Sequence, residues 1–243
     1  MKRARLAGAM LALLAATSAA AAADLPTKMA VKAPVVAPLP TWTGLYVGIA
    51  GGMGWARDRI EVNPGGFTTP TLTGNGAIFG GTLGYNWQYN ALIVGVEGDA
   101  SWARIDPKGS DATVFPTCTA GGIGTCGTEL QFLGTVRGRA GYLITNSVLL
   151  YATGGVAFGE LNASMNLPLV SVGAKEMRTG WTAGGGVEAM LFGNWTGKIE
   201  YLHVDLGNGP SFPVGGLTAS SADWHSDIVR VGVNYKLGNV LGR

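Results

Sequence analysis

The sequence is poor in charged residues and, beyond its N-terminus, lacks long apolar runs. Charged side chains make up 13% of the chain, about half of the share that is usual in soluble domains. After residue 25, no run contains the ~18 or more apolar residues that a membrane-spanning helix needs. The mean hydropathy is nevertheless positive, at +0.25, and 40 residues are glycine. The chain is therefore too apolar for an ordinary soluble domain and unsuited to helical membrane spans.

An apolar chain without spanning helices has one other way to cross a bilayer. Each backbone hydrogen bond in the hydrocarbon must be satisfied within the protein, which leaves closed β-barrels as the alternative to helices. The composition therefore predicts a transmembrane barrel. The net charge is only +2, without runs of like charge, so we expect no nucleic-acid partner.

The N-terminus has the composition of a secretory signal peptide. Lys2, Arg3 and Arg5 precede a short apolar stretch, and residues 21–23 are all alanine. We expect residues 1–23 to be removed on export, and a retained anchor helix is the alternative.

The next segment has the composition of a linker. Residues 24–40 are rich in proline, which favours an extended, solvated tether over a packed element. We expect this tether in the periplasm. It would be followed by the barrel over residues 41–238 and by a short C-terminal tail at residues 239–243.

Apolar and polar residues alternate through most of residues 41–238, as they do in strands with one apolar face. Each alternating segment reaches the ~9–11 residues that a tilted strand needs to cross a bilayer. The connections alternate between short and long, a pattern typical of outer-membrane barrels with short periplasmic turns and longer extracellular loops. We therefore predict an all-β, eight-stranded antiparallel up-and-down transmembrane β-barrel with both termini in the periplasm. The predicted strands cover residues 42–55, 75–87, 91–104, 130–144, 147–160, 177–192, 195–206 and 224–237.

The parity of the residues in each strand separates two faces. In the last strand, Val229, Val231 and Val233 alternate with Arg230 and Asn234. In a membrane barrel the apolar set faces lipid and the polar set fills the interior. Eight charged residues fall on the predicted inner face: Glu97, Asp99, Arg137, Arg139, Glu188, Lys198, Glu200 and Arg230.

These eight residues comprise four acids and four bases. An eight-stranded barrel is only wide enough for its side chains to fill the interior, and buried charges must pair. We therefore predict an ion-paired plug. A hydrated pore that uses rings of charge for selectivity is the alternative.

All the tryptophans fall at or within a few residues of a predicted strand end. The amphipathic indole ring prefers the headgroup level of a membrane. We therefore predict that they are interfacial aromatic residues: Trp42, Trp55, Trp87, Trp102, Trp181, Trp195 and Trp224.

A series of short motifs occurs in order along the chain. They are ADLP at 23–26, WTGLYVG at 42–48, GVEGD at 95–99, TVRGRAGY at 135–142, LYATGGVA at 150–157, GWTAGGGVE at 180–188 and RVGVNYK at 230–236. In this series the chain resembles the outer-membrane immunogenic protein family of alphaproteobacteria, which has the OmpA-type eight-stranded barrel. The resemblance implies an outer-membrane location and a role in envelope integrity or surface contact, without catalysis. Such barrels commonly end on an aromatic residue that the assembly machinery recognises, whereas this chain has Leu237 there.

Two motifs are candidates for other chemistry. Residues 122–127 match the dinucleotide-binding pattern G-x-G-x-x-G, but they lie between predicted strands without the helix that this motif requires. We attribute the match to chance and expect no cofactor.

Cys118 and Cys126 have no nearby histidine or third cysteine to complete a metal site. In an oxidising compartment they are expected to form a disulfide.

The two histidines leave one enzymatic alternative open. His203 and His225 lie at the predicted outer end of the last two strands, and Asp205, Asp223 and Asp227 are near in sequence. Barrel enzymes place catalytic groups at such rims, although a simple contact at the rim is the favoured interpretation.

The sequence thus favours a non-enzymatic, structural and surface-exposed barrel in the outer membrane. The alternatives are a narrow monomeric porin for small solutes or ions and a surface adhesin or receptor that acts through its outer loops. Those loops are predicted at residues 56–74, 105–129, 161–176 and 207–223. The expected partners are outer-membrane lipid, lipopolysaccharide and the outer-membrane assembly machinery, and the expected state is a monomer.

The disulfide prediction is testable in cells. Cys118 and Cys126 in the exported protein should react with a thiol reagent only after a reductant has been added. Replacing both residues with serine should leave the barrel assembled, because the bond is predicted in a loop. Labelling of either cysteine in intact cells without a reductant would contradict the prediction.

Overall fold

The computed structural model describes residues 41–238, apart from residues 59, 64–66, 69–70, 107–124, 167–170, 209–210, 215–216 and 222. The predicted signal peptide, tether and tail lie outside this part of the chain, as does Cys118, so these predictions and the disulfide stay predictions. In the described part, no helix is long and apolar enough to cross a membrane.

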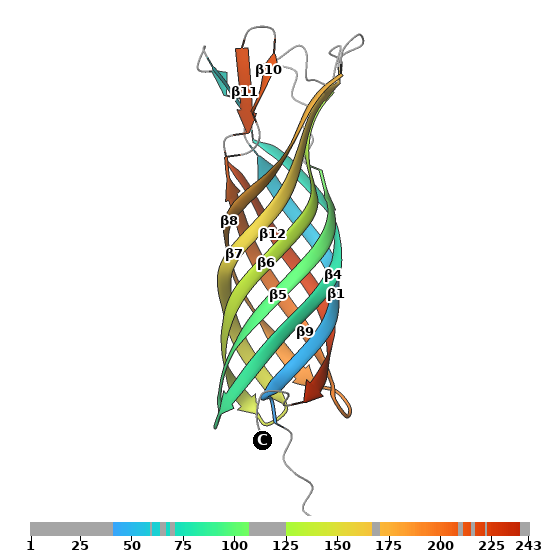
Figure 1. Cartoon of the computed structure of the whole chain (residues 1–243), viewed down its shortest axis with the longest axis vertical. Helices are drawn as coiled ribbons and strands as arrows, with labels where there is room; N and C mark the ends of the chain where they lie inside the picture. The colour runs from blue at the N-terminus through green and yellow to red at the C-terminus, as the bar shows by residue number, and fades with distance from the viewer. Residues whose placement is uncertain are drawn as a thin grey trace, which may run out of the picture. The chain divides into compact units, whose positions relative to one another are not determined.

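Eight strands form one closed antiparallel ring (Figure 1). β1 (Gly44–Asp58) pairs with both β4 (Leu72–Tyr89) and β12 (Trp224–Gly238), so the first and last strands close the ring. From β4 the ring continues through β5 (Leu92–Ile105), β6 (Thr125–Thr145), β7 (Val148–Asn166), β8 (Ser171–Met190) and β9 (Trp195–Gly207), and β9 pairs with β12. The predicted eight-stranded up-and-down barrel is confirmed.

Tight turns join the strands at one end of the barrel. They comprise residues 90–91, 146–147 and 191–194. Asn90 and Gly193 have φ angles of 55° and 54°, a left-handed conformation that asparagine and glycine adopt most readily. The long connections leave the opposite end (Figure 1), as the alternation of short and long connections predicts.

Two of the long connections form a second, four-stranded sheet. Its order is β10 (Ser211–Val214), β11 (Leu217–Ser221), β2 (Ile60–Asn63) and β3 (Phe67–Thr68). Because β11 pairs with β2, the connection after β9 is hydrogen-bonded to the connection after β1. The sequence predicts loops for both segments, and in this respect the prediction is wrong. Strands of two to five residues are too short to show a clear alternation.

β6, β7 and β8 are longer than predicted and continue past the rim of the barrel (Figure 1). The outermost backbone pair between β6 and β5 is Leu130 with Ile105, and that between β8 and β9 is Trp181 with Asp205. Beyond them, pairing among these three strands extends as far as Thr125 of β6. Cys126 therefore lies in the backbone of a strand, whereas the predicted loop included it. A strand that leaves the bilayer no longer needs an apolar outer face, so the alternation on which the prediction relied disappears there.

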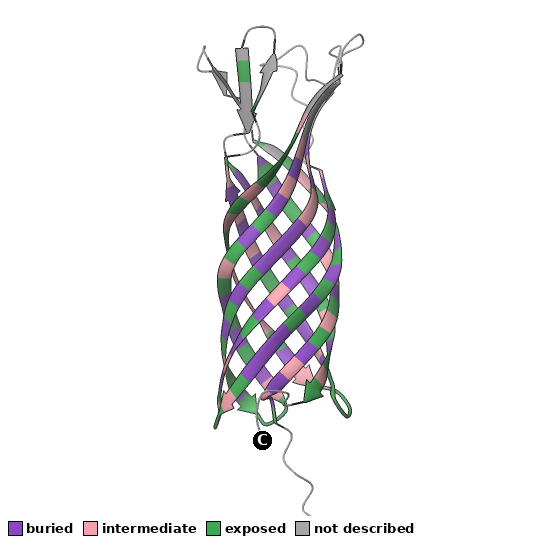
Figure 2. Ribbon diagram, viewed as in Figure 1, coloured by how far each residue is buried: buried purple, intermediate pink, exposed green. Residues whose placement is uncertain are grey.

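Buried and exposed residues alternate along the barrel strands (Figure 2). In β5, for example, Ile93 and Glu97 are buried, whereas Val96 and Trp102 are exposed. The exposed face carries large apolar side chains and the buried face carries charged ones, which is the reverse of a soluble barrel.

Glycines on the inner face make room for large side chains in the narrow interior. A Cβ atom at Gly84 would overlap the ring of Tyr46, which points into the interior from β1. On the same strand, Gly81 faces outward, and a Cβ atom there would meet only the carbonyl oxygen of Gly48, at 3.8 Å. The interior is therefore filled beside Gly84, whereas the outer surface has room for a methyl group at Gly81.

Gly84→Ala should therefore destabilise the barrel more than Gly81→Ala. The added methyl group of the first variant pushes Tyr46 away from Glu97, to which its hydroxyl donates at 2.8 Å, and overpacking costs about 1–3 kcal/mol. The refolded wild-type barrel should resist SDS until heated and migrate faster before heating. The temperature of this conversion should fall for Gly84→Ala and stay near the wild-type value for Gly81→Ala. Equal temperatures for both variants would show that the interior is not tightly filled at this position.

Candidate functional site

The interior of the barrel holds a layer of eight charged side chains from five strands. β5 supplies two acids, β6 two bases, β8 one acid, β9 one of each and β12 one base. These are the residues assigned to the inner face by parity, and all are buried: Glu97, Asp99, Arg137, Arg139, Glu188, Lys198, Glu200 and Arg230.

Arg137 contacts three of the four carboxylates in this layer. Its Nη2 pairs with Glu97, the residue directly opposite on the neighbouring strand β5, and lies 2.8 Å from Oδ2 of Asp99. Its Nη1 lies 3.1 Å from Oε1 of Glu200. Glu200 is on β9, which does not adjoin β6 in the ring, so this ion pair crosses the lumen.

Arg230 forms a second ion pair across the lumen. Its Nε donates to Oε2 of Glu200 on the neighbouring strand β9, at 2.6 Å. Its Nη1 lies 3.2 Å from Oδ1 of Asp99, which is on β5 and therefore across the lumen. Together, Arg137 and Arg230 link non-adjacent strands through shared carboxylates.

Arg139 and Lys198 complete the layer toward the short turns. Nη2 of Arg139 lies 2.7 Å from Oε2 of Glu188, and its guanidinium group lies 4.1 Å from the centre of the Tyr151 ring, within the range of a cation–π contact. Lys198 Nζ lies 3.0 Å from Oε2 of Glu97.

Uncharged polar residues on the inner face also bind these carboxylates. Thr135 donates to Asp99 at 2.5 Å, Tyr151 donates to Glu200 at 3.1 Å, and Asn234 donates to Glu188 at 2.9 Å. Each lies at the inward parity of its strand, and this alternation is the sequence signal that identifies them.

The charged layer has no net charge. Four carboxylates face three guanidinium groups and one ammonium group, and each carboxylate contacts at least one of these cations. Buried charges are costly unless they are both paired and hydrogen-bonded. Each of the eight side chains is ion-paired and makes at least one hydrogen bond within the layer, which lowers the free-energy cost of burying these charges.

Apolar side chains close the interior on both sides of the charged layer. Along β9, Lys198 and Glu200 are followed on the same face by the buried residues Leu202, Val204 and Leu206. These three belong to a cluster toward the long connections whose other large members are Ile78, Ile105, Leu130, Leu133, Leu161, Trp224 and Ile228. A second cluster toward the short turns contains Trp42, Ile93, Leu143, Leu149 and Tyr151.

Two of the seven tryptophans differ from their predicted role. Trp42 and Trp224 are 1% and 0% exposed and belong to the interior clusters, so they are not interfacial. Trp42 is held at the short-turn end, where its Nε1 donates to the carbonyl oxygen of Asn146 at 3.2 Å. The prediction used nearness to a strand end and ignored parity, which directs Trp42 and Trp224 inward. The other five are exposed: Trp55, Trp87, Trp102, Trp181 and Trp195.

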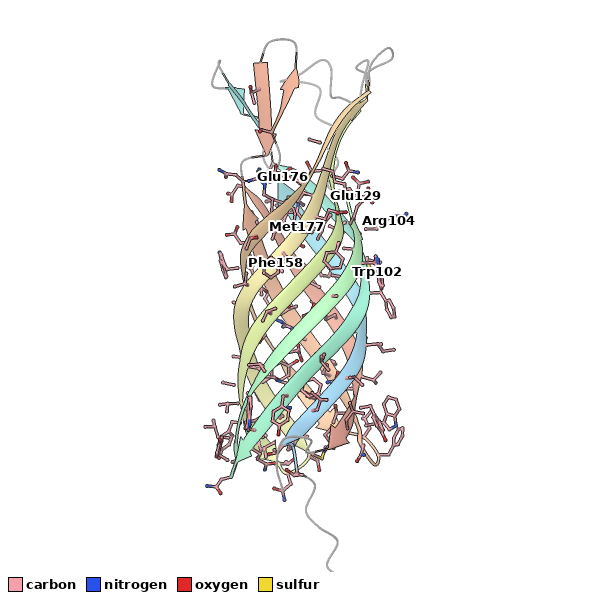
Figure 3. The ribbon with its side chains drawn as sticks, in the orientation of Figure 1. Trp102, Arg104, Glu129, Phe158, Glu176 and Met177 are labelled. Carbon is pink, nitrogen blue, oxygen red and sulfur yellow. The ribbon has the colours of Figure 1, made fainter. Side chains whose placement is uncertain are left out.

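The outer surface has an apolar band with charges at one edge. Trp102, Phe158 and Met177 are exposed on this surface. Figure 3 shows the charged residues Arg104 and Glu129 nearer to the end with the long connections. At the outward-facing positions of β5 there is no charged residue from Leu92 to Trp102, and this span has the length that a tilted strand needs to cross a bilayer.

The predicted rim histidines lie on the outer surface, at the same edge. His203 Nδ1 lies 2.8 Å from Oδ1 of Asp227, and Tyr201 donates to the same oxygen at 2.6 Å. The rings of His203 and His225 are 6.2 Å apart. Asp205 instead accepts a hydrogen bond from the backbone of Gly207. The structure thus brings His203 and Asp227 together.

A closed antiparallel ring with an apolar outer band and a filled, charge-balanced interior is an integral membrane β-barrel. More particularly, the chain belongs to the family described as "Outer membrane protein beta-barrel domain", whose model matches residues 9–236. An outer-membrane location follows, and the resemblance drawn from the sequence motifs is confirmed.

Similar proteins are named as outer-membrane proteins. The chain is 34% identical to the 31 kDa outer-membrane immunogenic protein of Brucella melitensis, over 94% of this chain and 97% of the relative. It is 33% identical to the 25 kDa outer-membrane immunogenic protein of Brucella abortus, over 93% and 94% of the two chains. It is also 33% identical to the 22 kDa outer membrane protein of Rhizobium leguminosarum, over 70% and 67%.

The charged layer generates a stability prediction. Arg137→Ala leaves three carboxylates without this partner and should cost about 3–5 kcal/mol of unfolding free energy. Arg104→Ala is the matched control, because its side chain is 89% exposed and its ion pair with Glu129 spans 3.9 Å. The urea midpoint in lipid vesicles should fall for Arg137→Ala and stay unchanged for Arg104→Ala. If both midpoints equal that of the wild type, water solvates the interior and the charges are not desolvated.

Proposed function

We propose that the protein is a non-enzymatic structural barrel of the outer membrane, closed to solutes, that exposes its long connections at the cell surface. The observation that carries this proposal is the stacking of three filled layers along the interior. An apolar cluster, the charged layer and a second apolar cluster follow one another from one end to the other. A barrel of this kind contributes rigidity and anchorage, because its closed ring satisfies its own backbone hydrogen bonds.

The proposed orientation follows from the two ends of the barrel. Short turns are typical of the periplasmic side and long connections of the outside. β1 begins and β12 ends at the short-turn end, because an even number of strands returns the chain to its starting side. Both termini would then be periplasmic. In this orientation we expect contacts with outer-membrane lipid and lipopolysaccharide, insertion by the assembly machinery, and a monomeric state.

A narrow porin is the second candidate, and one observation favours it. Within the described part of the interior, Nε of Arg137, Nε of Arg139 and Oδ1 of Asn86 are buried without a hydrogen-bond partner. Water molecules would satisfy these atoms, and water beside charged side chains is a requirement of an ion path. The apolar clusters on both sides argue against a continuous path, since a hydrophobic constriction opposes wetting.

Conductance across a planar bilayer distinguishes the two candidates. The refolded wild-type protein should show no steady channel. Trp42→Ala should also stay closed, because the charged layer and the cluster around Leu202 remain. The SDS-resistant, heat-modifiable form serves as the control that the inserted protein is folded. A steady unitary conductance of the wild-type protein would overturn the closed barrel and favour the porin.

A further inference from the structure

A groove on the outside of the barrel is independent of the filled interior. It has a volume of about 500 Å³, and its lining includes Trp55, Arg57, Thr73, Asn75, Tyr201 and Asp227. Trp55 of β1 pairs in register with Asn75 of β4 and with Asp227 of β12. The groove therefore lies across adjacent strands near the end with the long connections.

The groove combines aromatic faces with polar groups held in place. Trp55 and Tyr201 are exposed on the outer surface. Both hydrogen bonds to Asp227, from Tyr201 and His203, end on Oδ1, which leaves Oδ2 to accept from a ligand. The ring of His203 lies 5.4 Å from that of Trp181, which restricts the movement of the imidazole. These contacts preorganise the carboxylate before a ligand binds.

These groups fit a sugar phosphate better than a simple anion. The Asp227 carboxylate repels a bare phosphate but accepts hydrogen bonds from hydroxyl groups. Asn75 and Thr73 add an amide and a hydroxyl group. The faces of Trp55 and Tyr201 offer apolar surface to the carbon skeleton of a sugar ring, and the guanidinium group of Arg57 matches the geometry of a phosphate.

The surface beside the groove fits the remainder of a lipid. Met53, Ile199 and Val229 are exposed two residues from Trp55, Tyr201 and Asp227, on the side of the short turns. Acyl chains attached to a headgroup in the groove would therefore lie along the apolar band. A soluble sugar phosphate would gain nothing from this arrangement, so the joint geometry favours a membrane-embedded ligand.

We propose that this groove binds the phosphorylated sugar headgroup of a glycolipid in the outer leaflet. The inference rests on the proposed orientation, in which the long connections are extracellular. The headgroup sugar packs on Trp55 and Tyr201, its hydroxyl groups donate to Asp227, and its phosphate pairs with Arg57.

The chain contains a matched control for this site. The sequence Trp-Ala-Arg occurs at residues 55–57 and again at residues 102–104, near the same edge of the barrel. The second copy carries an exposed tryptophan and an exposed arginine, but none of its residues lines the groove. Arg57→Ala and Arg104→Ala therefore remove the same charge from equivalent strand positions.

Binding is measured on the refolded full-length barrel in nanodiscs, by titration calorimetry. The probe is a bisphosphorylated glucosamine disaccharide without acyl chains. We expect saturable binding by the wild type, weakened about tenfold by Arg57→Ala and by Asp227→Asn, as expected when one hydrogen bond to a charged group is lost. Arg104→Ala should bind like the wild type. Equal weakening by Arg57→Ala and Arg104→Ala would overturn the site, since general surface charge would then explain the binding.

Competition identifies the ligand chemistry. Inorganic phosphate or vesicles of phosphatidylglycerol, added before the titration, should reduce binding of the disaccharide probe only when their concentration far exceeds that of the probe. Displacement by either one at equal concentration would overturn the sugar-phosphate assignment. Absence of binding by a heat-modifiable, non-conducting barrel would overturn this inference alone. Retained binding by a conducting barrel would instead overturn the closed-barrel proposal and leave the groove standing.

Discussion

The guanidinium group of Arg137 lies among carboxylates from two strands that are not neighbours. The other interior side chains are arranged so that these contacts across the lumen can form. Glu97 is opposite Arg137 on β5, whereas Glu200 reaches it from β9 across the lumen. An eight-stranded ring is narrow enough for such contacts. Because the side chains fill most of so narrow a ring, each interior charge is paired with other side chains of the barrel. The need to pack and pair charges inside a narrow ring explains several features together. These are the glycine at position 84, the shared carboxylates, and the threonine and tyrosine donors.

The ion pairs across the lumen also couple the charged layer to closure of the ring. Arg230 is on the last strand, and its partner Asp99 is on β5. These two residues meet only when β12 has reached β1 and the ring has closed. The ion pair between Arg230 and Asp99 across the lumen and the backbone pairing of β1 with β12 are therefore completed together. A partly assembled sheet would leave the acids and bases exposed to water, which favours their remaining outside the hydrocarbon until the ring is complete.

Much of this organisation could be predicted from the sequence, because a barrel strand has a strict period of two. Parity was enough to assign Glu97 and Arg137 to the inner face, and their pairing across adjacent strands follows from that assignment. The contacts of Arg137 with Glu200 and of Arg230 with Asp99 could not be predicted, since they depend on the curvature of the ring. Trp42 was misassigned because its position near a strand end was given more weight than its parity. The short strands β2, β3, β10 and β11 were missed because their pairing is set by the meeting of two distant connections.

The pairing of β2 with β11 has a consequence for protein engineering. These strands come from opposite ends of the barrel sequence, and yet Val62 and Ala219 are partners in one sheet. The two connections are therefore a single structural unit, and neither can be replaced without affecting the other. A foreign peptide inserted within β2 or β11 would interrupt this pairing, so a display scaffold built on this barrel has to redesign both connections together.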